Sequence, residues 1–239
     1  SSGQFHSRTH CCKINEVLKQ KPMKVSDAVQ LRSSIRAFLN DPVPNELLKA
    51  LLQKSARAPS GGNLQPWKVF VLNGESLKKF LDFQADWSKP ESAAYDIYPP
   101  SLKEPYRSSR FEVGEQMYSL LEISRDDKEA RISQVMQNFN FFGAPAAIFC
   151  YIDREMGSPQ WSDLGMFLQT FMLLAQEAGL DTCAQEAWAL KQDSVSAFLK
   201  TSKSDMLFCG MAIGYRDKDA AINQLKTTRR SSDEWMKFV

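Results

Sequence analysis

Two short segments combine residue types that could hold a phosphorylated cofactor. The first, residues 32–36, reads Arg-Ser-Ser-Ile-Arg and offers two guanidinium groups and two hydroxyls, which can neutralise and hydrogen-bond a phosphate. The second, residues 58–67, reads Ala-Pro-Ser-Gly-Gly-Asn-Leu-Gln-Pro-Trp, and its glycine pair lets backbone N–H groups approach a ligand closely. Within it, Asn63 and Gln65 carry amides that can donate and accept at one edge of a heterocycle.

Histidine is nearly absent, which limits the chemistry that side chains could perform. The chain has two histidines, His6 and His10, and both precede the predicted domain. We therefore expect neither a Ser–His–Asp nor a Cys–His mechanism, and no His-ligated zinc or iron site. No catalytic side chain and no metal ligand is predicted, so the chemistry is expected to come from a bound cofactor.

The two segments need regular elements to position them. Apolar spacing and capping residues predict helices over residues 26–35, 44–58, 106–121, 126–137 and 163–178. Apolar β-branched and aromatic runs predict strands over residues 68–72, 145–151 and 207–213. Arg32 and Arg36 are four residues apart, so the first helix would place them on one face. Because helices and strands alternate without regular βαβ units, the pattern favours an α+β (α/β) sandwich with a central sheet.

Composition excludes several classes of protein. The net charge of +2 on 239 residues is too small to indicate a nucleic-acid or membrane partner, and no apolar run approaches the length of a membrane span. The polar N-terminal residues lack the apolar stretch of a signal peptide. The five cysteines include no Cys-x-x-Cys, and Cys150, Cys183 and Cys209 are expected to be buried packing residues. A reducing, cytoplasmic location is therefore predicted.

Five segments together resemble the FMN-dependent nitroreductase family. Residues 32–36 and the loop at 59–67 carry the resemblance, and three later segments follow in the family's order: 142–145 (Phe-Gly-Ala-Pro), 179–188 and 226–229. The likeness runs from about residue 25 to the C-terminus. Two positions depart from the commonest pattern, namely Leu31 where many members have arginine and Ala187 where many have glycine.

The resemblance implies FMN as the cofactor, with NADH or NADPH as the electron donor. A backbone N–H in the segment Gln185–Ala187 would face flavin N5, the atom that carries the chemistry. The implied cofactor-binding residues are Arg32, Ser33, Ser34, Arg36, Pro59, Ser60, Gly61, Asn63, Gln65, Gln185, Glu186, Ala187, Lys226 and Arg229.

The resemblance also implies a fold and an organisation. The fold is a central mixed sheet flanked by helices, in a domain-swapped homodimer. Residues 1–24 would form a flexible arm, 25–222 the FMN-binding domain with a lid or insertion at about 86–110, and 223–239 an arm exchanged with the partner subunit. The apolar residues Trp235, Met236, Phe238 and Val239 on a polar tail agree with such an exchange.

Taken singly, the same residues have plainer interpretations. The two arginines could form a solvated basic edge, the glycine pair an ordinary turn, and Lys226 with Arg229 an exposed basic tail. Glu186 could be a surface acid, and no proton transfer is assigned to it. The aromatic residues at 139, 141 and 142 are expected in the core, although one ring could reach the flavin. Tyr95, Tyr98 and Tyr106 of the lid could stack on a planar substrate.

The sequence thus predicts an FMN-dependent NAD(P)H oxidoreductase that reduces nitroaromatics or quinones by a two-electron, ping-pong mechanism. Three alternatives stay open. One is a reductive dehalogenase of the deiodinase type, because residues 91–95 (Glu-Ser-Ala-Ala-Tyr) distantly resemble that group's lid. Another is a non-enzymatic protein that binds or stores flavin. The third is a protein that binds a phosphate or nucleotide and no flavin.

Overall fold

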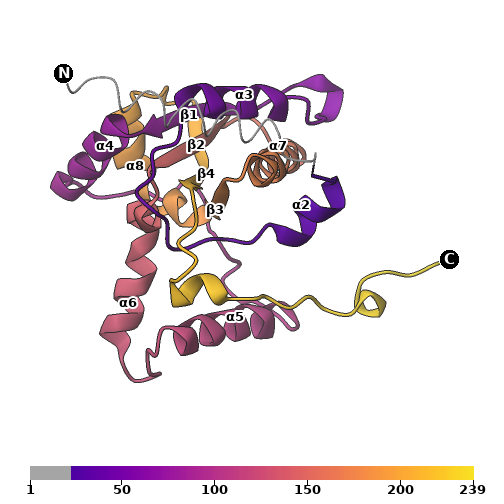
Figure 1. Ribbon diagram of the computed structural model, residues 1–239. Helices are drawn as coiled ribbons and strands as arrows, with labels where there is room; N and C mark the ends of the chain where they lie inside the picture. The colour runs from indigo at the N-terminus through magenta and orange to yellow at the C-terminus, as the bar shows by residue number, and fades with distance from the viewer. Residues whose placement is uncertain (1–22) are drawn as a thin grey trace, which may run out of the picture.

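A four-stranded sheet forms the middle layer of the structure, and helices pack on both of its faces (Figure 1). The computed structural model describes residues 23–239. Residues 1–22 of the predicted N-terminal arm, which spans residues 1–24, lie outside the described residues. The strand order is β1-β2-β4-β3. The strands are β1 (Lys68–Asn73), β2 (Ala146–Asp153), β3 (Asp181–Gln185) and β4 (Asp205–Gly214).

The two central strands are almost entirely buried, which explains their position. Every residue of β2 except Asp153 is buried, and so is every residue of β4 except Phe208. Strands that are covered on both faces read as continuous apolar runs, as these two do. All neighbouring strands pair antiparallel, while Ser34 forms one parallel bridge to Thr182 on the outer edge of β3. The four-stranded sheet is therefore antiparallel throughout, and the mixed pairing that was expected is limited to this one isolated bridge.

Three helices build the layer on one face of the sheet. They are α2 (Val25–Leu31), α3 (Asn45–Ser55) and α7 (Ser158–Glu177), and α7 contacts both of the others. Pro159 lies in the first turn of α7, where its missing N–H costs no hydrogen bond. Leu164, Phe167 and Phe171 follow at helical spacing and are at most 2% exposed, so they turn one face of α7 into the core.

The opposite face is covered by an aromatic cluster. Its elements are α4 (Glu75–Asp86), the 3-10 segments η2 (Gln137–Gly143) and η3 (Glu186–Lys191), and α8 (Gln192–Leu199). Trp188 is fully buried and stacks on Phe141, with the ring centroids 4.7 Å apart. Phe80 and Phe149 complete the cluster, with ring centroids 5.4 and 5.1 Å from that of Trp188.

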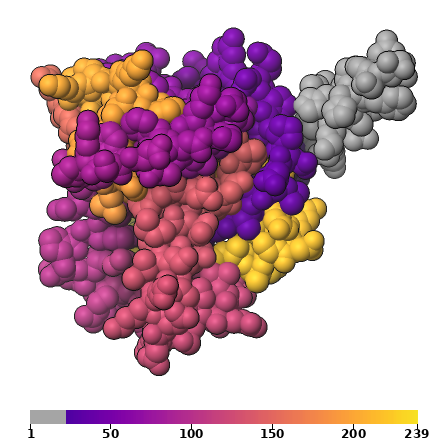
Figure 2. All heavy atoms as spheres, turned by 90° about the vertical axis from the view of Figure 1, so that its left-hand side faces the viewer, coloured from indigo at the N-terminus to yellow at the C-terminus, as the bar shows by residue number. Residues whose placement is uncertain are grey.

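Two helices project from this body. We call α5 (Tyr106–Leu120), α6 (Lys128–Met136) and their connection the helical projection; neither helix contains a buried residue. Figure 1 shows both below the sheet, and Figure 2 shows α6 standing out from the lower part of the body. The C-terminal arm, residues 223–239, begins in η4 (Ala221–Gln224), passes α5 and reaches η5 (Ser232–Glu234) at its far end (Figure 1).

Most predicted elements are confirmed, with their ends shifted by a few residues. The helix predicted over 26–35 is wrong, because α2 ends at Leu31 and the chain is extended from Arg32 onward. The open edge of β3 supplies backbone hydrogen bonds there, and these outweigh the local helical spacing. Within residues 23–239, no helix combines the length and apolar character needed to cross a membrane.

Candidate functional site

The segment of residues 32–36 lies along the outer edge of β3. Ser34 bridges Thr182, and the N–H of Ile35 donates to the Thr182 carbonyl at 3.0 Å. Because residues 32–36 are extended and not helical, helical spacing does not explain how the two arginines could act together. In an extended chain, as in a helix, residues four apart face the same side, so Arg32 and Arg36 keep a common direction in a different backbone.

The positive charge of this segment is not neutralised within the described chain. Neither Arg32 nor Arg36 forms an ion pair with a carboxylate of residues 23–239, and Arg36 Nη1 donates only to the Ser34 carbonyl, at 3.3 Å. Burial raises the pKa of the neighbouring Cys183 thiol, while the charges of both arginines and the Ser34 side chain act to lower it. Cys183 is 3% exposed, as predicted for a packing residue.

The loop of residues 59–66 is fixed at both ends by buried groups. At its start, the N–H of Gly61 donates to the carboxylate of Asp163, with both oxygens at 3.3 Å, and Asp163 is itself buried in α7. At its end, Pro66 is buried and Trp67 stacks on Phe167 with the ring centroids 4.9 Å apart. Trp67 is thus partly buried and packs against the hydrophobic core. The loop between these anchors is exposed.

The backbone of this loop is strained. Asn63 and Gln65 have φ angles of 56° and 51°, a left-handed conformation that side chains disfavour, and Gly62 has 57°. Two hydrogen bonds hold the turn: the N–H of Gln65 donates to Ser60 Oγ at 3.0 Å, and Gln65 Nε2 donates to the Asn63 carbonyl at 3.1 Å. Strain of this kind is retained where the surrounding structure requires it, and it clusters at ligand sites.

The segment Gln185–Ala187 carries the chain from β3 into η3. Gln185 is 2% exposed, and its Nε2 donates to the Asn138 carbonyl at 2.7 Å. Its side chain therefore faces the core, which leaves the backbone and the side chains of the next two residues for a ligand. Glu186 is exposed at the surface, yet partial desolvation raises the pKa of its carboxyl.

The buried side chain of Trp188 anchors the segment Gln185–Ala187 to the sheet. Its ring lies directly over Gly210 of β4, so a Cβ at position 210 would collide with the indole. The close approach of strand and ring explains why glycine occupies the centre of an otherwise large-residue strand. The rings of Phe139 and Phe141 pack against the same indole, and Phe142 is also buried, which confirms the predicted core role of residues 141 and 142.

The segment of residues 87–105 is anchored by the two residues that resemble a dehalogenase lid. Glu91 Oε2 accepts the N–H groups of Asp193 and Ser194 at 3.2 and 3.1 Å, so it caps the start of α8. The Tyr95 hydroxyl donates to the carbonyl of Phe208, and burial raises the pKa of that hydroxyl. Both side chains therefore serve the packing of the segment against the domain.

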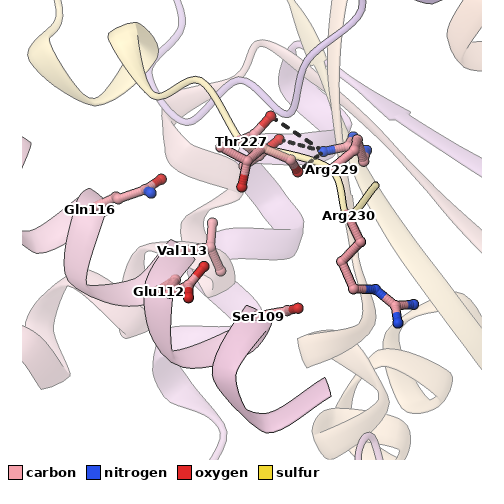
Figure 3. Close-up of a pocket in the computed structure, with 8 residues that line it drawn as sticks. Ser109, Glu112, Val113, Gln116, Thr227, Arg229 and Arg230 are labelled. Atoms are coloured by element: carbon pink, nitrogen blue, oxygen red, sulfur yellow. Dashed lines mark hydrogen bonds between the residues drawn. The ribbon is translucent and has the colours of Figure 1, made fainter. Parts of the chain in front are cut away.

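The C-terminal arm and α5 enclose a cavity of about 420 Å³. Its walls are Ser109, Glu112, Val113 and Gln116 on α5 and residues 227–230 on the arm (Figure 3). Arg229 Nη1 donates to Thr227 Oγ1 at 2.8 Å and to the Thr228 carbonyl at 2.9 Å, so its guanidinium stays on the arm. Lys226 is exposed. Among the described residues, the arm contacts Arg36 through Asn223 of η4. A contact of Lys226 or Arg229 with a phosphate stays a prediction.

Two residues that support the site were not predicted from the sequence. Asp163 holds the loop through Gly61, and Asn138 holds Gln185. A single acid at the start of the apolar stripe of α7 was the available signal for Asp163. For Asn138 we find no signal, because η2 and β3 meet only in the folded chain.

Proteins of known type match the chain along most of its length. The model of the nitroreductase family matches residues 29–215. A 4-nitrobenzoate reductase of Pseudomonas putida is 34% identical over 214 residues, covering 88% of this chain and 93% of the relative. A chloronitrobenzene nitroreductase of Comamonas testosteroni is 32% identical over 219 residues, covering 90% and 96%.

Solved structures give the same result. The FMN- and NADPH-dependent nitroreductase NfnB from Sphigopyxis sp. strain HMH is 42% identical, with a TM-score of 0.87 and coverage of 91% of this chain and 99% of that one. The FMN-dependent nitroreductase NfnB from Mycobacterium smegmatis, solved with NADPH, shares the fold at 24% identity, with a TM-score of 0.84 and coverage of 95% and 99%.

Proposed function

Because this chain belongs to the nitroreductase family, we propose that it is an FMN-dependent oxidoreductase that reduces nitroaromatic compounds with NADH or NADPH. Quinones are a second acceptor class with the same planar, electron-poor character. The observation that carries the proposal is the pair of arginines along the edge of β3, together with two serine hydroxyls; within residues 23–239 neither arginine has a carboxylate partner.

The donor set at this edge fits the phosphate of FMN. Arg32 and Arg36 offer charge, and Ser33 and Ser34 offer hydroxyls, in the combination that recognises phosphate best. A phosphate would also satisfy the guanidinium groups that the described chain leaves without carboxylates. We propose that Lys226 and Arg229 of the arm add positive charge to the same end of the cofactor.

The remaining predicted residues would hold the other end of the cofactor. When bound, FMN supplies the chemistry by taking up hydride and passing two electrons to an acceptor. The chain's own part is to position the cofactor. The strained loop with Asn63 and Gln65 offers amide groups, and the segment Gln185–Ala187 offers a backbone N–H group. Buried supports beneath both segments, Asp163 and Trp188, keep them in place.

We propose that two copies of the chain form a homodimer and exchange their C-terminal arms. The helical projection contains no buried residue, and on the arm Trp235, Met236 and Phe238 are 64%, 42% and 93% exposed. Apolar side chains presented together in this way favour burial against another surface. The free state of the described cysteines supports a reducing, cytoplasmic location.

The alternatives have less support. A dehalogenase lid would use Glu91 and Tyr95 toward the substrate, whereas here they cap α8 and bind the Phe208 carbonyl. A flavin-storage protein would show the same binding residues, so it is separated by turnover. The 34% and 32% identical relatives are named as enzymes that reduce nitro compounds, which favours the enzyme.

Steady-state kinetics test the proposal. The purified chain with FMN should oxidise NADPH or NADH only when a nitroaromatic or quinone is present. Double-reciprocal plots at several acceptor concentrations should be parallel, because donor and acceptor must use the same place beside the flavin in turn. Flavin binding without turnover would leave the storage alternative, and activity restricted to halogenated phenols would leave the dehalogenase.

A further inference from the structure

One side chain joins the phosphate segment to the C-terminal arm. Asn223 lies in η4 and is partly buried. Its Oδ1 accepts the backbone N–H of Arg36 at 2.9 Å, and its Nδ2 donates to the carbonyls of Ala37 and Asp217, both at 2.8 Å. Both donors and the acceptor of the amide are therefore in use. The sequence separation of 187 residues between Asn223 and Arg36 makes this a tertiary contact.

The Asn223 amide holds the backbone of Arg36 and Ala37, directly after the hydrogen bond that joins Ile35 to β3. The N–H of Ile35 is bound to Thr182 at 3.0 Å, and the N–H of Leu39 is bound to Tyr215 at 2.8 Å. Between these two, the N–H of Arg36 has Asn223 as its partner among the described residues. Without the amide, this donor would lose its hydrogen bond, and the residue that carries the guanidinium would gain freedom.

We infer that Asn223 is a positioning residue for the phosphate end of the cofactor. It fixes the backbone of Arg36 beside β3, and it fixes the start of the arm, which carries Lys226 three residues later, to the same backbone. Both sources of positive charge are then placed by one side chain. This inference rests on the proposed FMN site, and it adds a residue outside the set of expected ligands.

The inference predicts an effect on flavin affinity that depends on the phosphate. FMN carries a phosphate, whereas riboflavin has the same ring and ribityl chain without it. A residue that positions only the phosphate end should change the affinity for FMN and leave that for riboflavin nearly unchanged. A residue that merely stabilises the fold should change both alike, so the ratio of the two dissociation constants is diagnostic.

The experiment is a titration of the full chain, freed of flavin, with FMN and with riboflavin, followed by flavin fluorescence. Asn223→Ala should raise the dissociation constant of FMN about tenfold, the effect of one lost hydrogen bond, and that of riboflavin less than twofold. Gln224→Ala is the matched control, because within the described part of the chain the neighbouring amide donates to the Lys218 carbonyl alone, at 3.1 Å. This control should bind both flavins as the unchanged chain does.

A double-mutant cycle sharpens the test. If Asn223 acts in part through Arg36, Asn223→Ala should have a smaller effect on FMN in an Arg36→Ala background than in the unchanged chain, with the remainder arising through Lys226. Should Asn223→Ala fail to fold, Asn223→Ser is measured in the same way, with thermal unfolding as the check on folding. An equal loss of both flavins, or an unchanged affinity for FMN, would overturn the inference. An unchanged chain that binds neither flavin would contradict the proposed function itself.

Discussion

The aromatic cluster around Trp188 and the helical projection use their aromatic residues in opposite ways. In the cluster, Trp188, Phe80 and Phe149 are fully buried and contact one another through their rings. In the projection, Tyr106 and Phe111 are 58% and 56% exposed. Arginine side chains lie over these rings, at 5.5 Å from the centroid of Tyr106 and 5.3 Å from that of Phe111.

This difference separates what the chain needs in order to fold from what it offers to a second molecule. The cluster buries its rings within one chain, so it should stabilise the domain alone. The projection buries no residue within one chain, so it contributes little to the domain and remains available for a partner subunit. The candidate cofactor residues from Arg32 to Ala187 lie on the domain side of this division, whereas Lys226 and Arg229 lie on the arm that passes α5 (Figure 1).

The largest expected effect is on the buried side of the comparison. Trp188→Ala should lower the free energy of unfolding by about 3–5 kcal/mol, because it removes a fully buried ring and leaves a cavity. Urea denaturation measures this directly. The matched change in the projection, Phe111→Ala, should alter the free energy of unfolding of the domain by less than about 0.5 kcal/mol. Equal effects would show that the two regions do not differ as described.

The second prediction concerns the arm. Deleting residues 231–239 leaves Asn223, Lys226 and Arg229 in place but removes Trp235 and Phe238. Burying such side chains contributes about 1.5–3 kcal/mol each, so the shortened chain should lose its dimer while its domain stays folded. Light scattering gives the mass, and circular dichroism gives the fold. A shortened chain that remains dimeric would rule out the exchanged arm.

The third prediction compares arginines on the two sides. Arg32→Ala and Arg36→Ala should each weaken FMN binding by about tenfold to a hundredfold, the loss of one charge-assisted contact worth about 1.5–3 kcal/mol. Arg107→Ala is the control in the projection, because the ion-pair partner of Arg107 among residues 23–239 is Glu104, at 2.7 Å. Titration with FMN measures all three. The phosphate is placed wrongly if the three variants bind FMN equally well.

The smallest effect is a pH dependence of the projection. The hydrogen bond from Arg131 lowers the pKa of the Glu115 carboxyl, and this pair joins α5 to α6. A lowered pKa stabilises the folded state above the ordinary carboxyl pKa, and that contribution is lost as the pH falls through the lowered value. The hydrogen-exchange protection factors of α6, which are corrected for the intrinsic exchange rate at each pH, should therefore fall on acidification before those of β2 and β4. In Glu115→Gln, this fall should be absent; identical profiles would contradict the role of this pair.

Sequence patterns predicted the elements whose pattern is local. The apolar runs of β2 and β4 and the stripe on α7 needed no tertiary information. The strand β3 and the helices α4 and α8 were not predicted. β3 is only five residues long, and the sequence around it was interpreted through its resemblance. The extended path of residues 32–36 was mispredicted because its hydrogen bonds come from an edge strand about 150 residues away in sequence.

The candidate site was predictable in its residue types and less so in its supports. Arg32, Arg36 and the loop stand out in sequence because charge, glycine and amides occur together. Asp163, Asn138 and Asn223 act through side chains on distant elements, so their partners are identified only in the folded chain, although the single acid at the start of the apolar stripe of α7 was a signal for Asp163. The side chain of Gln185, expected at the cofactor, is turned toward Asn138. Buried layers can redirect a polar side chain in a way that no local pattern indicates.

The absorbance spectrum of the purified chain, followed by analysis of what heat releases, tests the central claim most directly. The proposed phosphate site at residues 32–36, together with the segment Gln185–Ala187 for the other end of the cofactor, predicts a yellow protein with the spectrum of oxidised flavin. Heating should release FMN, not FAD, in a ratio of about one per chain, since each chain carries one such arginine pair. A colourless protein that also fails to take up added FMN would contradict the claim.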